Sequence, residues 1–448
     1  MNGRNPLLPL NICIPDGEAH TMPDGRLYVY GSLDENKDGF CSGRYRVAST
    51  RDLKNWEVTE SPSFSVDAVP WAGASRSKKH SSLSLVRSIA DLPAHIQALL
   101  PPDAGTYPIE QIVAAIEQHA DEGLPKDIRL YAPDAISKDG MTYLYFCLSD
   151  DTEGVAVSKK PEGPFCGAEK LPVSGIDPAV FVDDDGCAYY YWGQFSANAA
   201  RLNPDMMSLD ESSIVNGILT EQEHHFHEGS SLRKRGDTYY YVFADVSRGR
   251  PCCLGYATSK SPLGPFTYQG VILDNGECDP KCWNIHGSIE EWNGQWYVFY
   301  HRSSNNSQYL RRLCCEPISF DESGRIPEVK MTSQGVGEPL RPGEWIPAGL
   351  ACAFSGWAYL DTEGGSEALV RMPVEGSAVF RYLETDVPLT QVLVKGLGEG
   401  SLSILCDGVM VGKGCANTAF TIAIAPGVHE LVIEAADGPF TLIGFQLF

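Results

Sequence analysis

"DGRLYVYGS", residues 24–32, decides the fold, because the sequence repeats its pattern four more times. Each copy is a turn of Gly with Asp or Asn, followed by alternating aromatic and aliphatic residues, which is typical of a tight hairpin leading into a strand. The later copies are DGMTYLYFC at 139–147, DGCAYYYWG at 185–193, GDTYYYVFA at 236–244 and NGQWYVFYH at 293–301.

After the long first interval, the copies follow one another at roughly 50 residues, close to the length of a four-stranded propeller blade. Segments with turns of Pro, Gly or Asn follow copies one, two and four, and they fit outer strands. A solenoid would also accommodate repeats, but a closed ring leaves fewer exposed sheet edges. The sequence therefore predicts an all-β chain whose first part, residues 1–335, is a five-bladed β-propeller.

The long first interval contains a helical pattern. Ile109, Ile112, Val113 and Ile116 recur at helical spacing, Pro108 suits a first helical turn, and Gly123 suits a stop. We expect a helical insertion at about 82–123 between blades one and two. It would pack on the side of a blade, act as a lid, or offer a surface to a second subunit.

The repeated phrase does not return after residue 335. Short alternating segments such as SLSILCD at 401–407 and HELVIEA at 429–435 are separated by Gly-rich turns. This pattern predicts a β-sandwich over 350–448, joined to the propeller by a linker over 336–349.

Composition narrows the partners and the compartment. The 448 residues carry a formal charge of −23, which disfavours nucleic acid and anionic membranes, and the basic run RSKKH at 76–80 is too short to override it. The fourteen cysteines are scattered, so we interpret most of them as reduced, buried thiols. No export signal or membrane-spanning run is visible, and we expect a cytoplasmic protein.

Acidic residues precede the repeated turns at matching distances. Asp16 and Asp177 lie nine residues before Gly25 and Gly186, Glu228 and His286 lie eight before Gly236 and Gly294, and Asp134 lies six before Gly140. The innermost strand of a propeller blade faces the central axis, so these side chains should converge at one mouth of the ring.

Carboxylates that share one site raise one another's pKa, a cost that favours a chemical role. Two carboxyl groups across a sugar are the equipment of glycoside hydrolysis, in which one donates a proton to the leaving oxygen and the other activates water. Each Asp alone also suits a turn, and His286 suits a structural hydrogen bond as well as a ligand role.

At these residues the sequence resembles glycoside hydrolase family 43, whose members are five-bladed propellers acting on arabinose- and xylose-containing glycans with inversion. The matching pieces are NPLLPLNICIPDGEAH, LYAPDA, GIDPAVFVDDDG, HEGSSLRKRGDTYYYVFAD and NIHGSIEEWNGQWYVFYHR. The resemblance implies that Asp16 is the general base, Glu228 the general acid and Asp177 the residue that adjusts the pKa of the acid.

The resemblance also implies roles around these three carboxylates. His286 would face an axial water or calcium ion, and Arg302 and Asp134 would bind sugar hydroxyls. Tyr131 stands where the family often has Trp. The tail is similar to the sandwich of carbohydrate-binding module family 6, with Trp357 and Tyr359 as exposed aromatic candidates. Other candidates to stack on a sugar face are Trp71, Trp192, Phe226 and Trp283.

The function implied is an inverting, exo-acting hydrolase that releases terminal α-L-arabinofuranose or β-D-xylose from plant-derived oligosaccharides. The chemistry requires no cofactor, and a structural calcium ion stays an open alternative. Other readings are a galactofuranosidase, an endo-arabinanase, or a propeller that binds carbohydrate without cleaving it. A homo-oligomer would form through the insertion or the sandwich.

Overall fold

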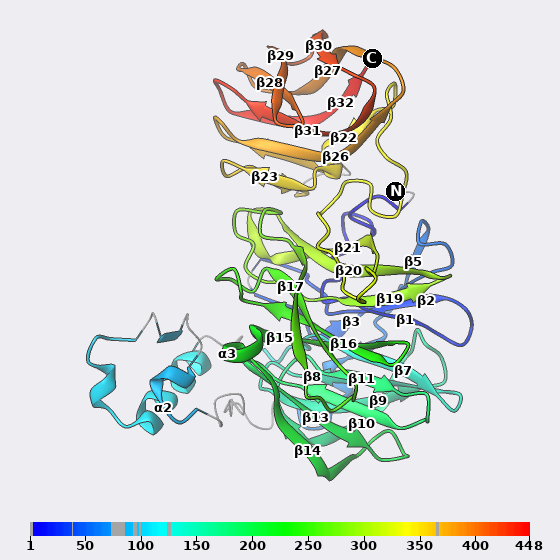
Figure 1. Ribbon diagram of the computed structural model, residues 1–448, viewed down its shortest axis with the longest axis vertical. Helices are drawn as coiled ribbons and strands as arrows, with labels where there is room; N and C mark the ends of the chain where they lie inside the picture. The colour runs from blue at the N-terminus through cyan, green and yellow to red at the C-terminus, as the bar shows by residue number, and fades with distance from the viewer. Residues whose placement is uncertain are drawn as a thin grey trace.

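The computed structural model describes residues 3–37, 39–72, 86–92, 96–97, 100–122, 127–363 and 367–448. Five small antiparallel sheets lie below a β-sandwich in Figure 1, and a helical insertion projects to one side. The five sheets are the predicted blades, so the fold class is confirmed. Among the described residues, no helix is long and apolar enough to span a membrane.

Each blade begins with two strands joined by one copy of the repeated turn. The strands of blades one and two are β1 (Glu18–Thr21), β2 (Leu27–Tyr30), β4 (Ala48–Thr50), β5 (Trp56–Val58), β7 (Asp134–Lys138), β8 (Met141–Cys147), β9 (Thr152–Ser158) and β10 (Cys166–Ser174). A short ribbon beside blade one pairs β3 (Arg44–Tyr45) with β6 (Phe64–Ser65), and the 3-10 turn η1 (Val66–Ala68) follows it.

Blades three to five continue in chain order. Their strands are β11 (Ala179–Val182), β12 (Ala188–Trp192), β13 (Ser196–Leu202), β14 (Leu209–Thr220), β15 (Phe226–Arg235), β16 (Thr238–Asp245), β17 (Cys253–Ser259), β18 (Thr267–Asp274), β19 (Ser288–Trp292), β20 (Gln295–Ser304) and β21 (Ser307–Ile318). A short helix, α3 (Glu221–His224), links blades three and four.

The ring closes through its inner strands and through the start of the chain. The inner strands β1, β7, β11, β15 and β19 contact one another in cyclic order, and β1 touches both β7 and β19. The Leu7 amide donates to the Leu313 carbonyl at 2.9 Å, and the Cys315 amide donates to Asn5 Oδ1 at 2.9 Å. The N-terminal segment therefore lies beside β21 and ties the ends of the propeller together.

The aromatic residues of the repeated phrase pack between blades. The ring centroids of Tyr145 in blade two and Tyr190 in blade three lie 5.3 Å apart. Those of Tyr191 in blade three and Tyr241 in blade four lie 5.4 Å apart. All four rings are buried. Alternation along each strand sends these rings toward the neighbouring blades, which explains why every copy of the phrase is rich in them.

The insertion is helical, as predicted. It contains the 3-10 turns η3 (Ile89–Asp91) and η4 (Ala104–Thr106) and the helix α2 (Ile109–Glu122). Ile112 is buried in a small core with Val86 and Leu92, and Phe195 of the propeller packs against this core. Gln222 Nε2 donates to the Asp91 carbonyl at 2.6 Å. The predicted stop at Gly123 and residues 82–85 lie outside the described residues.

The C-terminal domain is the predicted sandwich of two sheets. One contains β22 (Ile346–Pro347), β24 (Tyr359–Asp361), β25 (Leu369–Met372), β27 (Leu389–Leu397), β30 (Phe420–Ile424) and β32 (Phe440–Leu447). The other contains β23 (Ala353–Ser355), β26 (Ser377–Thr385), β28 (Ser401–Cys406), β29 (Val409–Cys415) and β31 (Gly427–Ala435), and η5 (Ala348–Leu350) precedes them. Phe380 and Phe445 meet at 4.8 Å between the sheets.

The segment 336–349 is not a free linker, which corrects the predicted boundary. Leu340 and Ile346 are fully buried in the core of the sandwich, and Ile346 pairs with Phe445 of β32. Apolar side chains at these positions belong to the sandwich because they bury against it. The sandwich therefore begins near residue 340.

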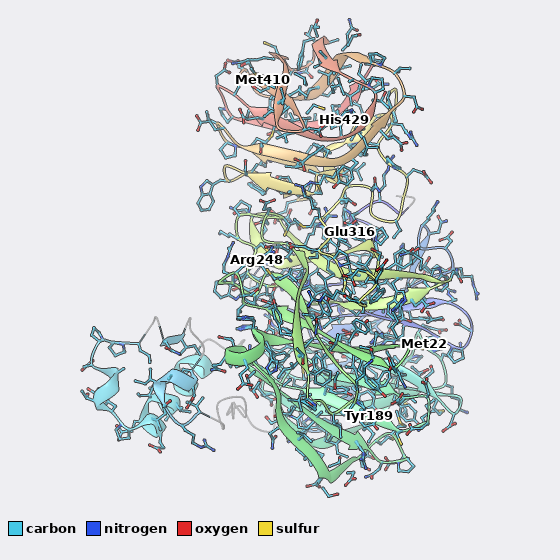
Figure 2. All side chains as sticks on the ribbon, in the orientation of Figure 1. Met22, Tyr189, Arg248, Glu316, Met410 and His429 are labelled. Carbon is cyan, nitrogen blue, oxygen red and sulfur yellow. The ribbon has the colours of Figure 1, made fainter. Side chains whose placement is uncertain are left out.

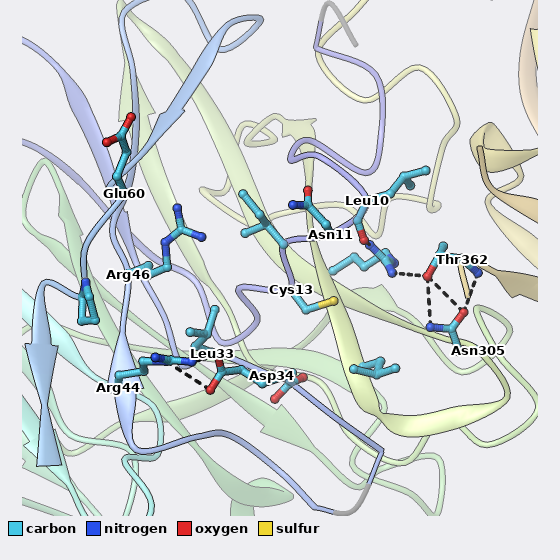
Figure 3. A pocket seen from close by; sticks show the side chains of 15 residues that line it. Leu10, Asn11, Cys13, Leu33, Asp34, Arg44, Arg46, Glu60, Asn305 and Thr362 are labelled. Atoms are coloured by element: carbon cyan, nitrogen blue, oxygen red, sulfur yellow. Dashed lines mark hydrogen bonds and ion pairs between the residues drawn. The ribbon is translucent and has the colours of Figure 1, made fainter. Parts of the chain in front are cut away.

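Several backbone hydrogen bonds fix the sandwich to the propeller. The amide of Asn305 donates to the Leu360 carbonyl at 2.7 Å, and the amide of Phe354 donates to the Glu277 carbonyl at 2.8 Å. A cavity of about 430 Å³ lies at this junction. Figure 3 shows its lining side chains, with Asn305 hydrogen-bonded to Thr362, and with Arg44 and Arg46 from the segment beside blade one. The two domains form one connected body along this seam.

Candidate active site

One pocket collects the residues that precede the repeated turns. Asp16, Asp177, Glu228 and His286 line a cavity of about 210 Å³, together with Arg311 and nine other residues. The predicted convergence of remote acids around the propeller axis is therefore what the structure shows. The cavity at the junction with the sandwich contains none of the three acids.

Asp16 and Asp177 enter the pocket from equivalent positions of blades one and three. Both have a left-handed backbone, with φ of 58° for Asp16 and 55° for Asp177, which Asp tolerates better than most residues. Each lies just before its inner strand, so the unusual backbone aims the carboxyl at the axis. Repetition of this local shape accounts for the shared spacing seen in the sequence.

Asp16 is held as an anion by Arg311. Arg311 Nη1 lies 2.8 Å from Asp16 Oδ1, and Ser32 Oγ donates to Asp16 Oδ2 at 2.5 Å. Burial alone would raise the pKa of Asp16, but the Arg311 guanidinium and the neighbouring His301 ring outweigh it, and the pKa lies well below its ordinary value. An ionised carboxylate of this kind is suited to accept a proton from water.

Asp177 and Glu228 form a second, contrasting pair. Burial, followed by the charges of Glu228 and Asp16, raises the pKa of Asp177 to about 7, although His286 and Arg311 work against the rise. Gln194 Nε2 donates to Glu228 Oε2 at 2.8 Å, and Asn284 Nδ2 lies 3.4 Å from Glu228 Oε1. Asp177 therefore keeps a proton available close to neutral pH, within the pocket that also contains Glu228.

His286 lies beneath the acids on the axis. Its Nδ1 is 3.6 Å from Asp177 Oδ2, and its Nε2 is 3.7 Å from Glu18 Oε1. Burial alone would lower the pKa of His286, but Glu18, Asp177 and Asp16 raise it to about 9. The ring therefore favours its protonated form between the Glu18 and Asp177 carboxylates.

Below His286, a buried polar cluster fills the axis. Glu18, His20 and Asp134 place ligand-type atoms within 4.8 Å of one another. His20 Nε2 lies 2.6 Å from Asp134 Oδ1, which also accepts from the Ala135 amide, and the Val180 amide donates to Asp134 Oδ2 at 2.8 Å. Asp134 thus serves the core, and it is not among the residues that line the pocket, which corrects its predicted role in sugar binding.

Arg302, predicted to bind sugar hydroxyls, lies elsewhere. Its Nη2 donates to the Thr332 carbonyl at 2.7 Å and lies 3.8 Å from Glu316, which Figure 2 labels near the junction with the sandwich. Arg302 pairs directly with Arg312 across β20 and β21, so Arg311 is the residue on the opposite face. That alternation places Arg311, and not Arg302, in the pocket.

Of the four proposed stacking residues, only Trp283 lines the pocket, where it is 44% exposed. Trp192 and Phe226 are buried in the packing between blades. Trp71 stacks on Phe146 at 6.1 Å and donates to Thr152 Oγ1 at 3.3 Å, and it is not a lining residue. Strand alternation sends Trp192 of β12 and Phe226 of β15 into blade interfaces, whereas Trp71 lies in a turn after η1, and the three predictions are wrong for these reasons.

The sequence interpretation missed several residues of the pocket. Arg311 contacts Asp16, and Gln194 and Asn284 contact Glu228. The ring of Phe40 lies 4.8 Å from the Arg311 guanidinium. Gln194 directly follows the third copy of the phrase, at the end of the second strand of its blade. Since that end of each hairpin faces the same mouth as the acids, this position was a usable signal.

The chain is similar in sequence to known proteins over most of its length. The model of the family described as glycosyl hydrolases family 43 matches residues 109–326. A xylosidase/arabinosidase of Thermoclostridium stercorarium is 31% identical over 99% of this chain and 98% of its own length. The chain belongs to glycosyl hydrolase family 43. A xylosidase/arabinosidase of Bacteroides ovatus is 30% identical to this family 43 glycoside hydrolase over 69% of the chain and 93% of its own length.

Solved structures resemble the same regions. A family 43 β-xylosidase/α-arabinofuranosidase from a compost microbial metagenome, solved with xylotriose, covers 73% of this glycoside hydrolase and 98% of its own chain, with 28% identity and a TM-score of 0.54. An arabinoxylan arabinofuranohydrolase of Bacillus subtilis covers 99% of this chain and 97% of its own at 22% identity and a TM-score of 0.51. The latter likeness shows that the fold, including the sandwich, is shared.

Proposed function

We propose that this family 43 glycoside hydrolase is an exo-acting, inverting enzyme that releases β-D-xylose or α-L-arabinofuranose from the ends of oligosaccharides. The observation that carries the proposal is the contrast within one pocket between Asp16, ionised by Arg311, and Asp177, whose pKa is raised to about 7 beside Glu228. The relatives named as xylosidase/arabinosidase support the choice of sugars.

In the proposed reaction, Glu228 donates a proton to the glycosidic oxygen as the bond from that oxygen to the anomeric carbon breaks. Asp16 accepts a proton from a water molecule whose oxygen attacks the anomeric carbon from the opposite face. The products are the shortened glycan and a free sugar of inverted configuration. After turnover Asp16 releases its proton to solvent and Glu228 takes one up from solvent, so all the carboxyls return to their starting state. Asp177 orients Glu228 and adjusts its pKa, and no cofactor is called for.

Release from chain ends suits the size of the pocket. Its volume of about 210 Å³ is below the 300–1,000 Å³ of pockets for drug-sized ligands. Phe40, Tyr131 and Trp283 are among the lining residues and offer apolar surface to a sugar ring. A pocket of this kind accepts a terminal sugar more readily than the middle of a polymer.

A panel of nitrophenyl glycosides, followed by proton NMR of the product during the first turnovers, tests this proposal. We expect cleavage of the β-D-xylopyranoside or the α-L-arabinofuranoside, and α-D-xylose as the first product of a β-xyloside. β-D-Xylose as the first product of a β-xyloside would contradict inversion. Cleavage of the β-D-galactofuranoside alone would show that the enzyme is a galactofuranosidase and not a xylosidase or arabinofuranosidase. Sugar binding without cleavage of any glycoside would refute an enzymatic role.

A further inference from the structure

The buried axis below the pocket raises a question of charge. Glu18 and Asp134 are both fully buried, and with His20 they form the kind of donor set that holds metal ions. Burying carboxylates far from water is costly unless a positive charge or hydrogen bonds compensate for them. A divalent cation would be one solution, and an arginine would be another.

Arg233, on the inner strand β15, reaches this cluster with every part of its guanidinium in use. Its Nη2 lies 2.6 Å from the Ala19 carbonyl, 3.3 Å from Glu18 Oε2 and 3.2 Å from His20 Nε2. Its Nε donates to Glu290 Oε2 at 2.8 Å, and its Nη1 donates to the Leu232 carbonyl at 2.8 Å. The side chain is 9% exposed, so the charge is held inside the protein.

The remaining donors do not fit a calcium ion, which prefers six to eight oxygen ligands. Both oxygens of Asp134 already accept hydrogen bonds, and Glu18 Oε2 accepts from Ser231 Oγ at 3.0 Å as well as from Arg233. Glu18 Oε1 is the one carboxylate oxygen of this cluster without a hydrogen-bond partner. His286 Nε2 lies 3.7 Å from this oxygen, and one free carboxylate oxygen is far fewer than the ligands that a calcium ion requires.

We propose that Arg233 is the resident cation of the propeller axis, so that this enzyme holds its catalytic carboxylates in place without a structural calcium ion. The contacts run from Arg233 to Glu18, from Glu18 to His286, and from His286 to Asp177. Arg233 does not touch the pocket and is therefore a positioning residue. It fixes Glu18, which in turn holds the charged His286 ring beneath the acids.

The residues that connect Arg233 to Asp177 have charged neighbours of both signs. Glu18 faces Arg233, His286 and the charge of Asp134. His286 faces Glu18, Asp177 and Asp16, and Asp177 faces His286, Glu228, Asp16 and Arg311. Loss of Arg233 would leave Glu18 without its fixed partner and weaken the hold of Glu18 on the His286 ring.

The first test uses the unmodified protein and does not depend on its activity. Metal content is measured by mass spectrometry before dialysis. Tm is measured before dialysis, after dialysis against a chelator, and after Ca²⁺ is added back. We expect less than one metal ion per chain before dialysis and the same Tm under these three conditions. One calcium ion per chain, whose removal lowers Tm and whose return restores it, would overturn the proposal.

The second test removes the arginine. Arg233→Ala should lower kcat/KM on the order of 10–100-fold, as expected for loss of a supporting contact, and added guanidinium at millimolar concentration should restore part of it, whereas added Ca²⁺ should not. Arg248→Ala is the matched control, because Arg248 also binds two carboxylates, Asp274 and Glu328, but at the surface. A fully active Arg233→Ala variant would contradict the proposal.

A third variant covers the case in which Arg233→Ala does not fold. Arg233→Met combined with Glu18→Gln removes the buried cation and its anionic partner together, so the double variant should have a higher Tm than Arg233→Met alone. A double variant that is no more stable would show that Arg233 does not compensate Glu18. These readouts stand even if the proposed hydrolysis fails, because metal content and Tm do not require a substrate.

Discussion

Replacement of Arg311 by Met removes the cation that two buried carboxylates share. Arg311 Nε lies 2.9 Å from Asp34 Oδ2, and Nη1 lies 2.8 Å from Asp16 Oδ1, while all three side chains are at most 5% exposed. Breaking one side of a buried ion pair costs about 3–5 kcal/mol. Native domains have about 5–15 kcal/mol in total, so Arg311→Met should fold at 25 °C with a much lower Tm.

The same variant should lose activity in a pH-dependent way. Arg311 holds the pKa of Asp16 below that of the unfolded chain, so this group stabilises the fold at all pH values above its unfolded pKa of about 3.9. Without Arg311 the pKa of Asp16 rises, and the acidic limb of the kcat/KM profile moves to higher pH. Near pH 6 we expect a loss on the order of 100-fold, the scale of general base catalysis.

The assay combines urea unfolding with the pH profile of kcat/KM on an aryl glycoside. Arg312→Met is the matched control, because Arg312 is the adjacent, equally buried arginine, yet it donates to the Leu10 carbonyl, Ser304 and Thr362. The control should lose some stability and keep the wild-type acidic limb. An Arg311→Met profile that coincides with wild type would refute the assignment of Asp16 as a base held ionised by Arg311.

Two further variants test the other side of the pocket. Burial and nearby charges raise the pKa of Asp177 to about 7, so the contribution of Asp177 to stability falls as the pH rises from about 4 to 7. Asp177→Asn should therefore be more stable than wild type to urea at pH 8 but not near pH 4. Lower stability of the variant at pH 8 would contradict this expectation. Trp283→Ala should raise KM about tenfold by loss of sugar stacking, while Trp345→Ala, equally exposed on the sandwich, should leave KM unchanged.

The fold could be predicted from the sequence because its signals are local. Each turn and the alternation that follows it lie within about ten residues, and the five copies became the five inner hairpins. Equivalent positions in equivalent blades meet at one axis, so the convergence of Asp16, Asp177 and Glu228 also followed from spacing. The insertion helix was legible for the same reason, since Ile109–Ile116 repeat at helical spacing.

The rest depended on contacts between distant segments. Arg311 reaches Asp16 across 295 positions of the chain, because the last blade closes against the first, and no local pattern reports such a contact. Alternation also does not say which face of a strand meets the axis, so Arg302 and Trp192 were placed in the pocket while they pack elsewhere. Arg233 was missed because its partners Glu18 and Glu290 come from two other blades.

The division of labour between acid and base is tested most directly by comparing two variants on two substrates. Glu228→Ala should lose far more kcat/KM on a natural xylo-oligosaccharide than on an aryl xyloside whose leaving group needs no proton. Asp16→Ala should lose activity on both to a similar extent, because water must be activated in each case. Equal losses of Glu228→Ala on the two substrates would contradict the account.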